Sequence, residues 1–571
     1  MKNVKNINNS STSLPSLGRG GERLLIYQVF TRLFGNKNTT CHEDGTLEEN
    51  GTGKFADFDA KTLKRIHQLG ANYIWYTGVI RHATTTDYTK FGIPRQHPSV
   101  VKGRAGSPYA ICDYYDVDPD LATDVDKRME EWESLIARSH KAGLKVVMDF
   151  VPNHVARQYR SMAKPAGVQD LGAGDNRNWH FSPQNNFYYC VGEDFVSPNG
   201  NGYIESPARA TGNDAFTSRP SINDWYETVK LNYGVDYNDW SGTPSDHFSP
   251  VPDTWVKMTD ILLFWASKGI DAFRCDMAEM VPCAFWHYAS EKLKAAYPGV
   301  LLIGEVYNPA QYRNYIAAGF DYLYDKVGMY DTLRAITCDQ CSTAAITSQW
   351  QTVDDIRDHM LYFLENHDEQ RIASDFFAGN AQKAIPALII SALLYKNPVM
   401  IYAGQEFGEK GMDKEGFSGQ DGRTTIFDYW CVDTLRRGYY DRRKLTPAEK
   451  ALEAEYQIIL NIARDEASVA GGLTYDLMYV NPALAPDQYA FLRSIEKKGK
   501  TEAMLVAVNF CDYEQRVEIN IPAHAFDYMH ISEGTVEAVD LLSGKTIPLT
   551  LKKDAPVSVI LPANGGVALK F

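Results

Sequence analysis

The chain of 571 residues lacks the usual marks of a membrane or nucleic-acid-binding protein. It has no apolar run approaching the roughly 18 residues of a membrane span, and no stripe of lysine and arginine. Lys+Arg number 58 and Asp+Glu number 72, which gives a formal net charge of −14. An acidic chain without a basic stripe is not expected to bind nucleic acid. With 44% hydrophobic and 23% charged residues, its composition is that of a globular protein and excludes a disordered one.

Cysteine is also scarce. Nine cysteines, an odd number scattered over a long chain, do not form a disulfide framework. Cys338 and Cys341 make a CxxC pair, but no second pair completes a zinc site. The first twenty residues are polar and lack the apolar segment of a signal peptide. We therefore expect a flexible tail at 1–20 and a cytoplasmic protein; a periplasmic or secreted location would apply if a leader had been removed.

What the sequence does contain is a repeated alternation of short apolar runs and amphipathic stretches. The apolar runs are 24–30, 72–76, 145–150, 270–274, 301–305, 322–324, 360–364 and 398–403. Near-continuous apolar runs suit strands buried on both faces of a parallel sheet. Between them, stretches such as 255–268 carry apolar residues at i, i+3, i+4 and i+7, as an amphipathic helix does. Eight such units predict an α/β fold, a (β/α)8 barrel.

Two regions depart from this alternation. Residues 155–252, after the third predicted strand, are rich in Asn, Gly, Pro and Tyr and are too long for a structureless loop. We expect them to form a small inserted domain, with the barrel built from 21–154 and 253–468. Residues 469–571 show short alternating runs between Gly, Pro and Asn turns, and no helix is evident. They predict a C-terminal antiparallel β-sandwich.

Polar side chains follow four of the predicted barrel strands. They lie in the segments Asp149–His154, Arg274–Asp276, Gly304–Glu305 and Glu365–Asp368. A lone Asp after a strand is usually a helix cap or turn residue, and a lone His is usually structural. Four such segments in succession are different, because the carboxyl ends of barrel strands all meet on one rim where the active sites of such barrels lie.

The residue types on this rim fit glycoside hydrolysis. A retaining glycosidase needs a nucleophilic carboxylate and a carboxylic acid about 5–5.5 Å apart. Asp276 and Glu305 follow adjacent strands, which lie about 4.8 Å apart. Arg274 is on the same strand face as Asp276 and is expected to keep it ionised. Burial and crowding are expected to keep Glu305 protonated. Asp368 and the two histidines are expected to bind sugar hydroxyls.

In their order and composition the motifs DFVPNH, DAFRCD, IGEV and ENHD resemble glycoside hydrolase family 13, the α-amylase family, over the chain from about Leu24 to Phe571. The resemblance implies that Asp276 is the nucleophile, Glu305 the general acid/base and Asp368 the stabiliser of the transition state. It also implies that Asp149 is structural and that the sugar is held by Arg274, His154, His367 and a stacking tyrosine, Tyr109. Core packing is the alternative role for Tyr109.

The chain departs from the family pattern at two informative positions. Relatives that attack non-reducing ends often carry an Asp where this chain has Gly106, which favours internal or oligosaccharide cleavage. Many relatives bind calcium at the root of the inserted domain. Asn153 fits one ligand position, but Lys230 stands where a carboxylate is usual, and an ammonium cannot ligate a cation. We therefore predict no metal ligand and no cofactor for the chemistry, with structural calcium disfavoured.

The sequence thus predicts a retaining glycosidase that cleaves α-1,4 bonds of starch, glycogen or maltooligosaccharides through a covalent glycosyl-Asp276 intermediate. A transglycosylase or an α-1,6-acting relative would carry the same residues. A glucan-binding protein without activity is a remote alternative, because all three carboxylates are present. An α-glucan is the only partner that the sequence indicates, and the oligomeric state is left open.

Overall fold

The computed structural model describes residues 23–237 and 243–571, and the predicted tail at 1–20 lies outside these residues. Eight parallel strands close into a barrel in the order β1-β16-β15-β14-β13-β12-β5-β2. The strands are β1 Leu25–Phe30, β2 Tyr73–Thr77, β5 Lys145–Phe150, β12 Ala272–Cys275, β13 Leu301–Gly304, β14 Tyr322–Tyr324, β15 Met360–Phe363 and β16 Val399–Tyr402. All eight overlap the predicted apolar runs, and the predicted (β/α)8 fold is confirmed.

Alternate residues of these strands fill the inside of the barrel. Ile26, Trp75, Val147 and Ile303 belong to one buried cluster there. Side chains alternate between the two faces of a strand, so the next inward positions lie nearer the carboxyl ends. On β12 the inward position after Ala272 is that of Arg274. Successive inward-facing positions of one strand therefore lie first in the packed core and then at the polar rim.

Helices surround the barrel, and their local sequences explain where they begin. The principal ones are α3 Ala60–Leu69, α4 Arg128–Lys141, α5 Asp253–Ser267, α6 Cys283–Ala296, α7 Tyr312–Ala317, α8 Asp331–Thr337, α9 Ala344–Thr352, α10 Ile385–Leu393 and α12 Pro447–Asp465. Before α12, Thr446 accepts a hydrogen bond from the Glu449 amide, while Glu449 binds the Thr446 amide. This capping box and Pro447 in the first turn fix the start of the helix.

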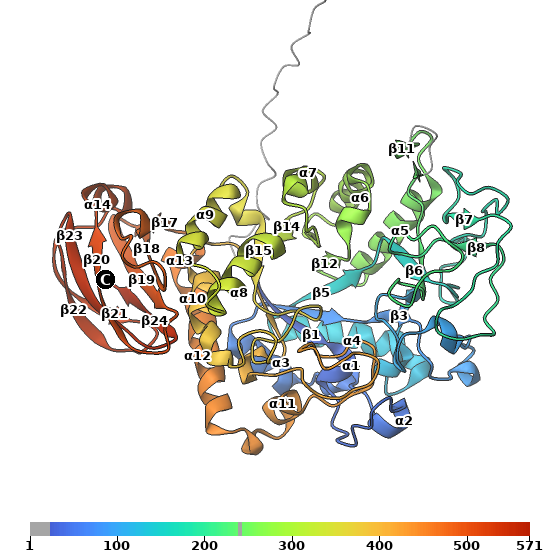
Figure 1. Cartoon of the computed structure of the whole chain (residues 1–571), viewed down its shortest axis with the longest axis horizontal. Helices are drawn as coiled ribbons and strands as arrows, with labels where there is room; N and C mark the ends of the chain where they lie inside the picture. Colours follow the sequence, from blue (N-terminus) through green and yellow to red (C-terminus); the bar gives the residue numbers. More distant parts are fainter. Residues whose placement is uncertain (1–22, 238–242) are drawn as a thin grey trace, which may run out of the picture.

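Residues 155–237 and 243–252 form a loop-rich excursion on the side of the barrel away from the sandwich (Figure 1). Its short strands are β6 His154–Ala156, β7 Tyr189–Cys190, β8 Ala208–Arg209, β9 Thr228–Lys230, β10 Val235–Asp236 and β11 Ser245–Asp246. A buried ion pair between Arg157 and Glu205, 2.7 Å long, holds the excursion together. The guanidinium also lies 3.7 Å from the centre of the Phe195 ring. This polar contact adds to the apolar packing of buried residues such as Phe187, Val229 and Leu231.

The C-terminal region is an antiparallel sandwich of a six-stranded sheet, β17-β18-β19-β24-β21-β22, and a two-stranded sheet, β20-β23. The strands are β17 Leu473–Asp476, β18 Gln488–Lys497, β19 Lys500–Asn509, β20 Gln515–Ile521, β21 Gly534–Asp540, β22 Thr546–Leu551, β23 Ala555–Leu561 and β24 Gly565–Lys570. The expectation that this region has no helix was wrong, because α14 spans Ala523–Met529. Its buried side chains, Ala525, Phe526 and Met529, occupy less than two turns, too short a stretch to show helical periodicity.

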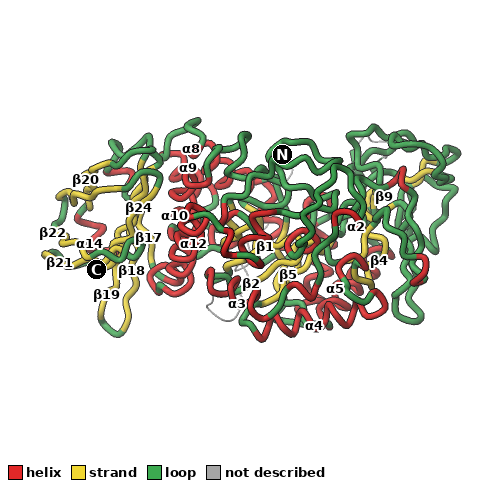
Figure 2. Tube along the Cα trace, turned by 90° about the horizontal axis from the view of Figure 1, so that it is seen from below, coloured by secondary structure: helices red, strands yellow, loops and turns green. Residues whose placement is uncertain are grey.

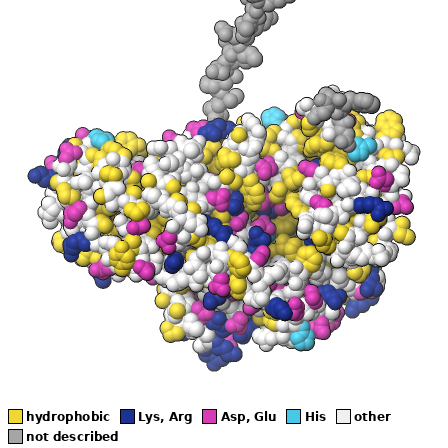
Figure 3. Space-filling model, in the orientation of Figure 1, with side chains coloured by type: hydrophobic (Ala, Val, Ile, Leu, Met, Phe, Trp, Pro, Cys, Tyr) yellow, Lys and Arg dark blue, Asp and Glu magenta, His cyan; other side chains and the backbone are white. Residues whose placement is uncertain are grey.

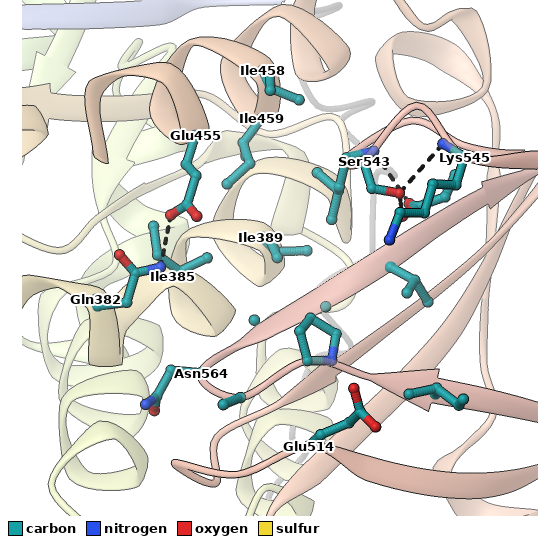
Figure 4. A pocket seen from close by; sticks show the side chains of 18 of the residues that line it. Gln382, Ile385, Ile389, Glu455, Ile458, Ile459, Glu514, Ser543, Lys545 and Asn564 are labelled. Atoms are coloured by element: carbon teal, nitrogen blue, oxygen red, sulfur yellow. Dashed lines mark hydrogen bonds between the residues drawn. The ribbon is translucent and has the colours of Figure 1, made fainter. Parts of the chain in front are cut away.

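Helices α8, α9, α10 and α12 form a layer between the barrel strands and the sandwich (Figure 2). Isoleucines from α10 and α12 face β-strand residues across a cavity of about 490 Å³ (Figure 4). At Gly566 on β24 a Cβ atom would lie 2.6 Å from the Ala507 carbonyl oxygen and 3.2 Å from Ile389. The absence of a side chain at Gly566 therefore allows helix α10 to approach the sheet.

On the face seen in Figure 3, acidic and basic side chains are mixed with one another. Among the described residues, no helix combines the length and the apolar character that a bilayer crossing requires.

Candidate active site

A cavity of about 470 Å³ opens at the carboxyl end of the barrel. Five of the seven predicted site residues line it, namely Tyr109, His154, Asp276, Glu305 and Asp368. The other two, Arg274 and His367, are buried and bound to members of this set, at 1% and 2% exposure. The structure thus brings all seven predicted residues together, although their roles stay predictions.

Strand geometry explains why these residues meet. Asp276 follows β12 and Glu305 follows β13, and these two strands pair in parallel with Cys275 opposite Gly304. Residues one position beyond that pair are therefore side by side. Asp368 comes from the loop after β15, which enters the same rim.

Arg274 is the centre of the site. Its Nη1 lies 2.7 Å from Asp276 Oδ1 and 3.6 Å from Asp149 Oδ1. Its Nη2 lies 2.7 Å from Glu305 Oε2. Its Nε donates to the Tyr324 hydroxyl at 3.3 Å. One buried guanidinium thus contacts three carboxylates, and it sets the position of the two proposed catalytic groups relative to each other.

Glu305 has two further donors that the sequence analysis missed. The Tyr307 hydroxyl donates to Oε1 at 2.6 Å, and the backbone amide of Met277 donates to Oε2 at 2.7 Å. Met277 has a φ of 41°, in the left-handed region, where a non-glycine residue is uncommon. Tyr307 was detectable, because it stands two residues after Glu305 in the sequence. No feature of the sequence predicts the left-handed backbone conformation of Met277.

The rim carries more acidic than basic side chains, and the pKa values of several of its carboxyl groups are raised. Burial raises the pKa of Asp276 well above its usual value; Arg274 opposes this and the charge of Glu305 adds to it. Burial and the charge of Glu305 raise the pKa of Asp368 to about 7. Burial raises that of Asp149 to about 6, against the effect of Arg274. A group of carboxyl groups so placed retains a proton near neutral pH.

The sequence argument placed this proton on Glu305 alone. In the structure burial raises the pKa of Asp276, Asp368 and Asp149. At Asp276 burial outweighs the effect of Arg274, which was expected to keep that carboxyl group ionised. The proton is therefore a property of the carboxyl cluster, and its position depends on which groups are hydrogen-bonded at the time.

Both histidines of the rim are neutral. Burial lowers the pKa of His367 well below its usual value, and burial together with Lys230 lowers that of His154 to about 3. The Gln28 side chain donates to His367 Nδ1 at 2.8 Å. The proton of His367 therefore lies on Nε2, which faces the Tyr109 hydroxyl and lies 3.1 Å from Asp368 Oδ2. Neutral imidazoles of this kind suit hydrogen bonds with uncharged hydroxyl groups.

Tyr109 takes part in both the wall of the cavity and the buried network. Its ring stacks on His367 with centroids 5.4 Å apart and an angle of 29°. The Arg274 guanidinium lies 5.5 Å from the ring centre. At 8% exposure the ring is buried, yet it lines the cavity. This placement is compatible with stacking on a sugar and with core packing.

A second charged pair lies in the wall of the cavity, and the sequence analysis did not predict it. Lys102 Nζ lies 3.1 Å from Glu227 Oε2, and both residues line the cavity. Glu227 comes from the inserted region and Lys102 from the loop before β4 (Ile111–Val117). Trp225 and Phe427 line the same cavity. Loops far apart in sequence thus supply the walls, and no local motif could pair them.

At the root of the inserted region, Lys230 occupies the position where a metal ligand was considered. Its Nζ lies 2.6 Å from Asp214 Oδ1 and donates to Asn153 Oδ1 at 2.7 Å. The side chain is 2% exposed. The ammonium therefore supplies the positive charge between these two oxygens.

Comparison with known proteins agrees with this geometry. The family model described as "Alpha amylase, catalytic domain" matches residues 28–455. The chain is 26% identical over 344 residues to Alpha-amylase 3 of Dictyoglomus thermophilum, covering 57% of this chain and 59% of that protein. It is 25% identical over 397 residues to Alpha-amylase MalA of Haloarcula japonica, covering 68% and 45%. The chain thus spans about half the length of the curated relatives it matches.

A solved structure of an alpha-amylase from Geobacillus thermoleovorans, complexed with acarbose, shares the fold. The TM-score is 0.62 at 18% identity, and the match covers 96% of this chain and 98% of that one. The likeness extends over the barrel, the inserted region and the sandwich together.

Proposed function

Because the chain belongs to the α-amylase family of glycoside hydrolases, we propose that it is a retaining enzyme that cleaves α-1,4-glucosidic bonds of starch, glycogen or maltooligosaccharides. The observation that carries the proposal is the pair Asp276 and Glu305, which bind the same guanidinium at 2.7 Å each. Two carboxyl groups held by one arginine lie close together. The retaining mechanism requires such closeness, whereas an inverting one leaves room for water between them.

The proposed reaction has two steps. In the first, the proton of the carboxyl cluster lies on Glu305 and Asp276 is ionised; an Asp276 oxygen attacks the anomeric carbon, the bond to the glycosidic oxygen breaks, and Glu305 gives its proton to that oxygen. This produces a glycosyl ester on Asp276 and a free chain end. In the second, Glu305 takes a proton from water, which attacks the same carbon and releases Asp276. The sugar product keeps its α configuration because the carbon is inverted twice.

The surrounding residues are assigned supporting roles. Arg274 holds Asp276 in position, and Tyr307 and the Met277 amide hold Glu305. Asp368, His154 and His367 are assigned to bind hydroxyls of the sugar as it flattens toward the transition state. Tyr109 is assigned to the face of that sugar. No step needs a metal ion, because the proton transfers and the nucleophile are supplied by carboxyl groups.

The test is a proton NMR time course of the protein with maltoheptaose. We expect α-anomeric reducing ends to appear before mutarotation, together with shorter maltooligosaccharides. Products longer than the substrate would instead establish transglycosylation. No change with maltoheptaose, but cleavage of pullulan fragments, would show an α-1,6 preference. No change with either substrate would contradict the enzymatic proposal and favour a glucan-binding protein.

A further inference from the structure

Three tyrosines and a histidine form an exposed cluster on the sandwich, far along the chain from the catalytic residues. They are Tyr475 on β17, Tyr479 in η14 (Met478–Val480), and His524 and Tyr528 on α14. We call this set the tyrosine platform. Tyr479 is 57% exposed and Tyr528 is 53% exposed. Exposed aromatic side chains are ordinary when single, but a contiguous group marks a contact surface.

The rings of the platform are held in place by one another. The Tyr475 ring centre lies 6.3 Å from that of Tyr479, 6.0 Å from Tyr528 and 5.5 Å from His524. The Tyr475 and Tyr479 hydroxyls are 2.7 Å apart, and both bond to His524 Nε2. A surface ordered in this way loses little conformational entropy when it binds.

The platform is also anchored from below. Asp476, which follows Tyr475, accepts hydrogen bonds from the Tyr489 hydroxyl at 2.7 Å and from Trp350 Nε1 at 3.2 Å. Trp350 belongs to α9 of the barrel. The strand that carries Tyr475 is therefore fixed to the catalytic barrel as well as to the sandwich.

The chemistry of the platform suits an uncharged ligand with flat apolar faces and hydroxyl edges. Its side chains offer ring faces, two exposed tyrosines and a hydroxyl–imidazole network. The neighbouring charges give no positive surplus, since Lys553 Nζ lies 2.8 Å from Asp527 of α14 and is also near the charges of Glu533 and Asp554. Tyrosine combines a large rigid apolar face with a polar tip at a low entropic cost. A polyanion would find no surplus of positive charge in this pair.

We infer that the tyrosine platform is a second carbohydrate site, which binds a stretch of an α-glucan chain outside the catalytic cavity. The inference rests on the proposed function, which supplies the ligand class. In Figure 1, α14 and β17 lie at one edge of the sandwich, and the inserted region lies on the opposite side of the barrel. A long glucan held at the platform stays near the cavity, so its local concentration rises, whereas a short oligosaccharide gains nothing.

The test compares the double variant Tyr479→Ala/Tyr528→Ala with Tyr513→Ala. Tyr513 is 58% exposed on the same sandwich but lies outside the platform, so it controls for the loss of any surface tyrosine. Both are made in full-length protein carrying Asp276→Asn, so that the glucan is not consumed, and affinity for soluble starch is measured by electrophoresis in starch-containing gels. We expect Kd to rise about tenfold or more in the double variant and to stay unchanged in the Tyr513 variant.

The same substitutions in the catalytically intact protein give the second readout. We expect slower hydrolysis of starch at low concentration and unchanged hydrolysis of maltotriose, with an unchanged melting temperature. The proposed carbohydrate site would be overturned if the double variant bound starch as tightly as its parent. It would also be overturned if Tyr513→Ala lost as much affinity as the double variant. Platform-dependent binding by a protein that cleaves neither maltoheptaose nor starch would support the platform while overturning the proposed function.

Discussion

Two buried arginines lie at the same end of the barrel, and their surroundings differ. Arg371 has one carboxylate partner, Glu365, at 2.8 Å. Its other nitrogen–hydrogen groups donate to Thr424 Oγ1 at 2.8 Å and to the Ala403 carbonyl at 3.0 Å. The Ile372 amide donates to Glu365 Oε1 at 2.7 Å. One cation thus faces one carboxylate here, and burial raises the pKa of Glu365 against the effect of Arg371.

Arg274 instead contacts Asp149, Asp276 and Glu305, with Asp368 raising the negative charge further. The surplus negative charge makes at least one proton part of the site. The comparison teaches that one carboxylate paired with one arginine serves to fix position, whereas several carboxylates around one arginine add mutual repulsion to the effect of burial and favour the bound proton that acid–base chemistry needs.

The comparison is tested most strongly by Asp276→Asn. We expect kcat on maltoheptaose to fall about 10⁴-fold or more, because no glycosyl ester can form on an amide. The melting temperature should change little, since the variant removes one of several acids around Arg274. Reducing-end release and thermal unfolding are the measurements. Wild-type turnover in this variant would remove Asp276 from the mechanism.

Glu365→Gln should give the opposite outcome. We expect the free energy of unfolding to fall by about 3 kcal/mol, because Arg371 is left as an uncompensated buried charge. The kcat per folded molecule should stay within a few fold of wild type. Urea unfolding at pH 7 and active-site titration measure the two quantities. A large loss of kcat with unchanged stability would mean that Glu365 belongs to the catalytic group.

A smaller effect is expected in the pH dependence of stability, where the carboxyl cluster around Arg274 should differ from an ordinary exposed ion pair. The pKa of Asp368 is raised to about 7, so its stabilising contribution is present below about pH 4, where the group is protonated in both states. That contribution is lost as the pH rises through 7. Asp368→Asn cannot ionise, so its melting temperature should exceed that of wild type at pH 8 and differ little at pH 4.5. The increase should be a few degrees at most, because the Asp368 side chain is 39% exposed and solvent screens its charge. Asp354→Asn, at an exposed ion pair, is the control and should show a constant difference.

The smallest effect is expected at a third buried cation, Lys230. Since its ammonium lies between Asn153 and Asp214, chelation by EDTA should shift the melting temperature by less than about 1 °C. Calorimetry with and without EDTA, followed by added calcium, measures this. A fall of many degrees that calcium restores would show that the protein holds a structural cation elsewhere.

The barrel and six of the seven rim residues were predictable for a physical reason, whereas Tyr109 follows no barrel strand and was predicted from the family resemblance alone. Buried parallel strands must be apolar on both faces, and their carboxyl ends meet, so a polar residue directly after such a run has few possible positions. The same reasoning joined Arg274 to Asp276, two residues apart on one strand.

The remaining features depend on contacts that no local pattern records. Lys102 and Glu227 meet because two long loops converge, and their separation in sequence carries no periodicity. Helix α14 is too short to show its period. The protonation of the rim depends on the summed charge of residues from four strand ends, and a sequence gives the charges but not their distances.

The closure of the barrel has a consequence for how the protein is made. Leu25 on the first strand pairs with Val399 on the last, and Gln28 reaches His367 across the same seam. A ribosome adding about 5–20 residues per second needs roughly 20 to 80 s between these two strands. During that time the edge of β1 next to β16 is unpaired and open to other chains. Assembly of the catalytic rim thus waits until β16 has been made, and nascent chains that are cut short before residue 399 are expected to be inactive and prone to aggregate.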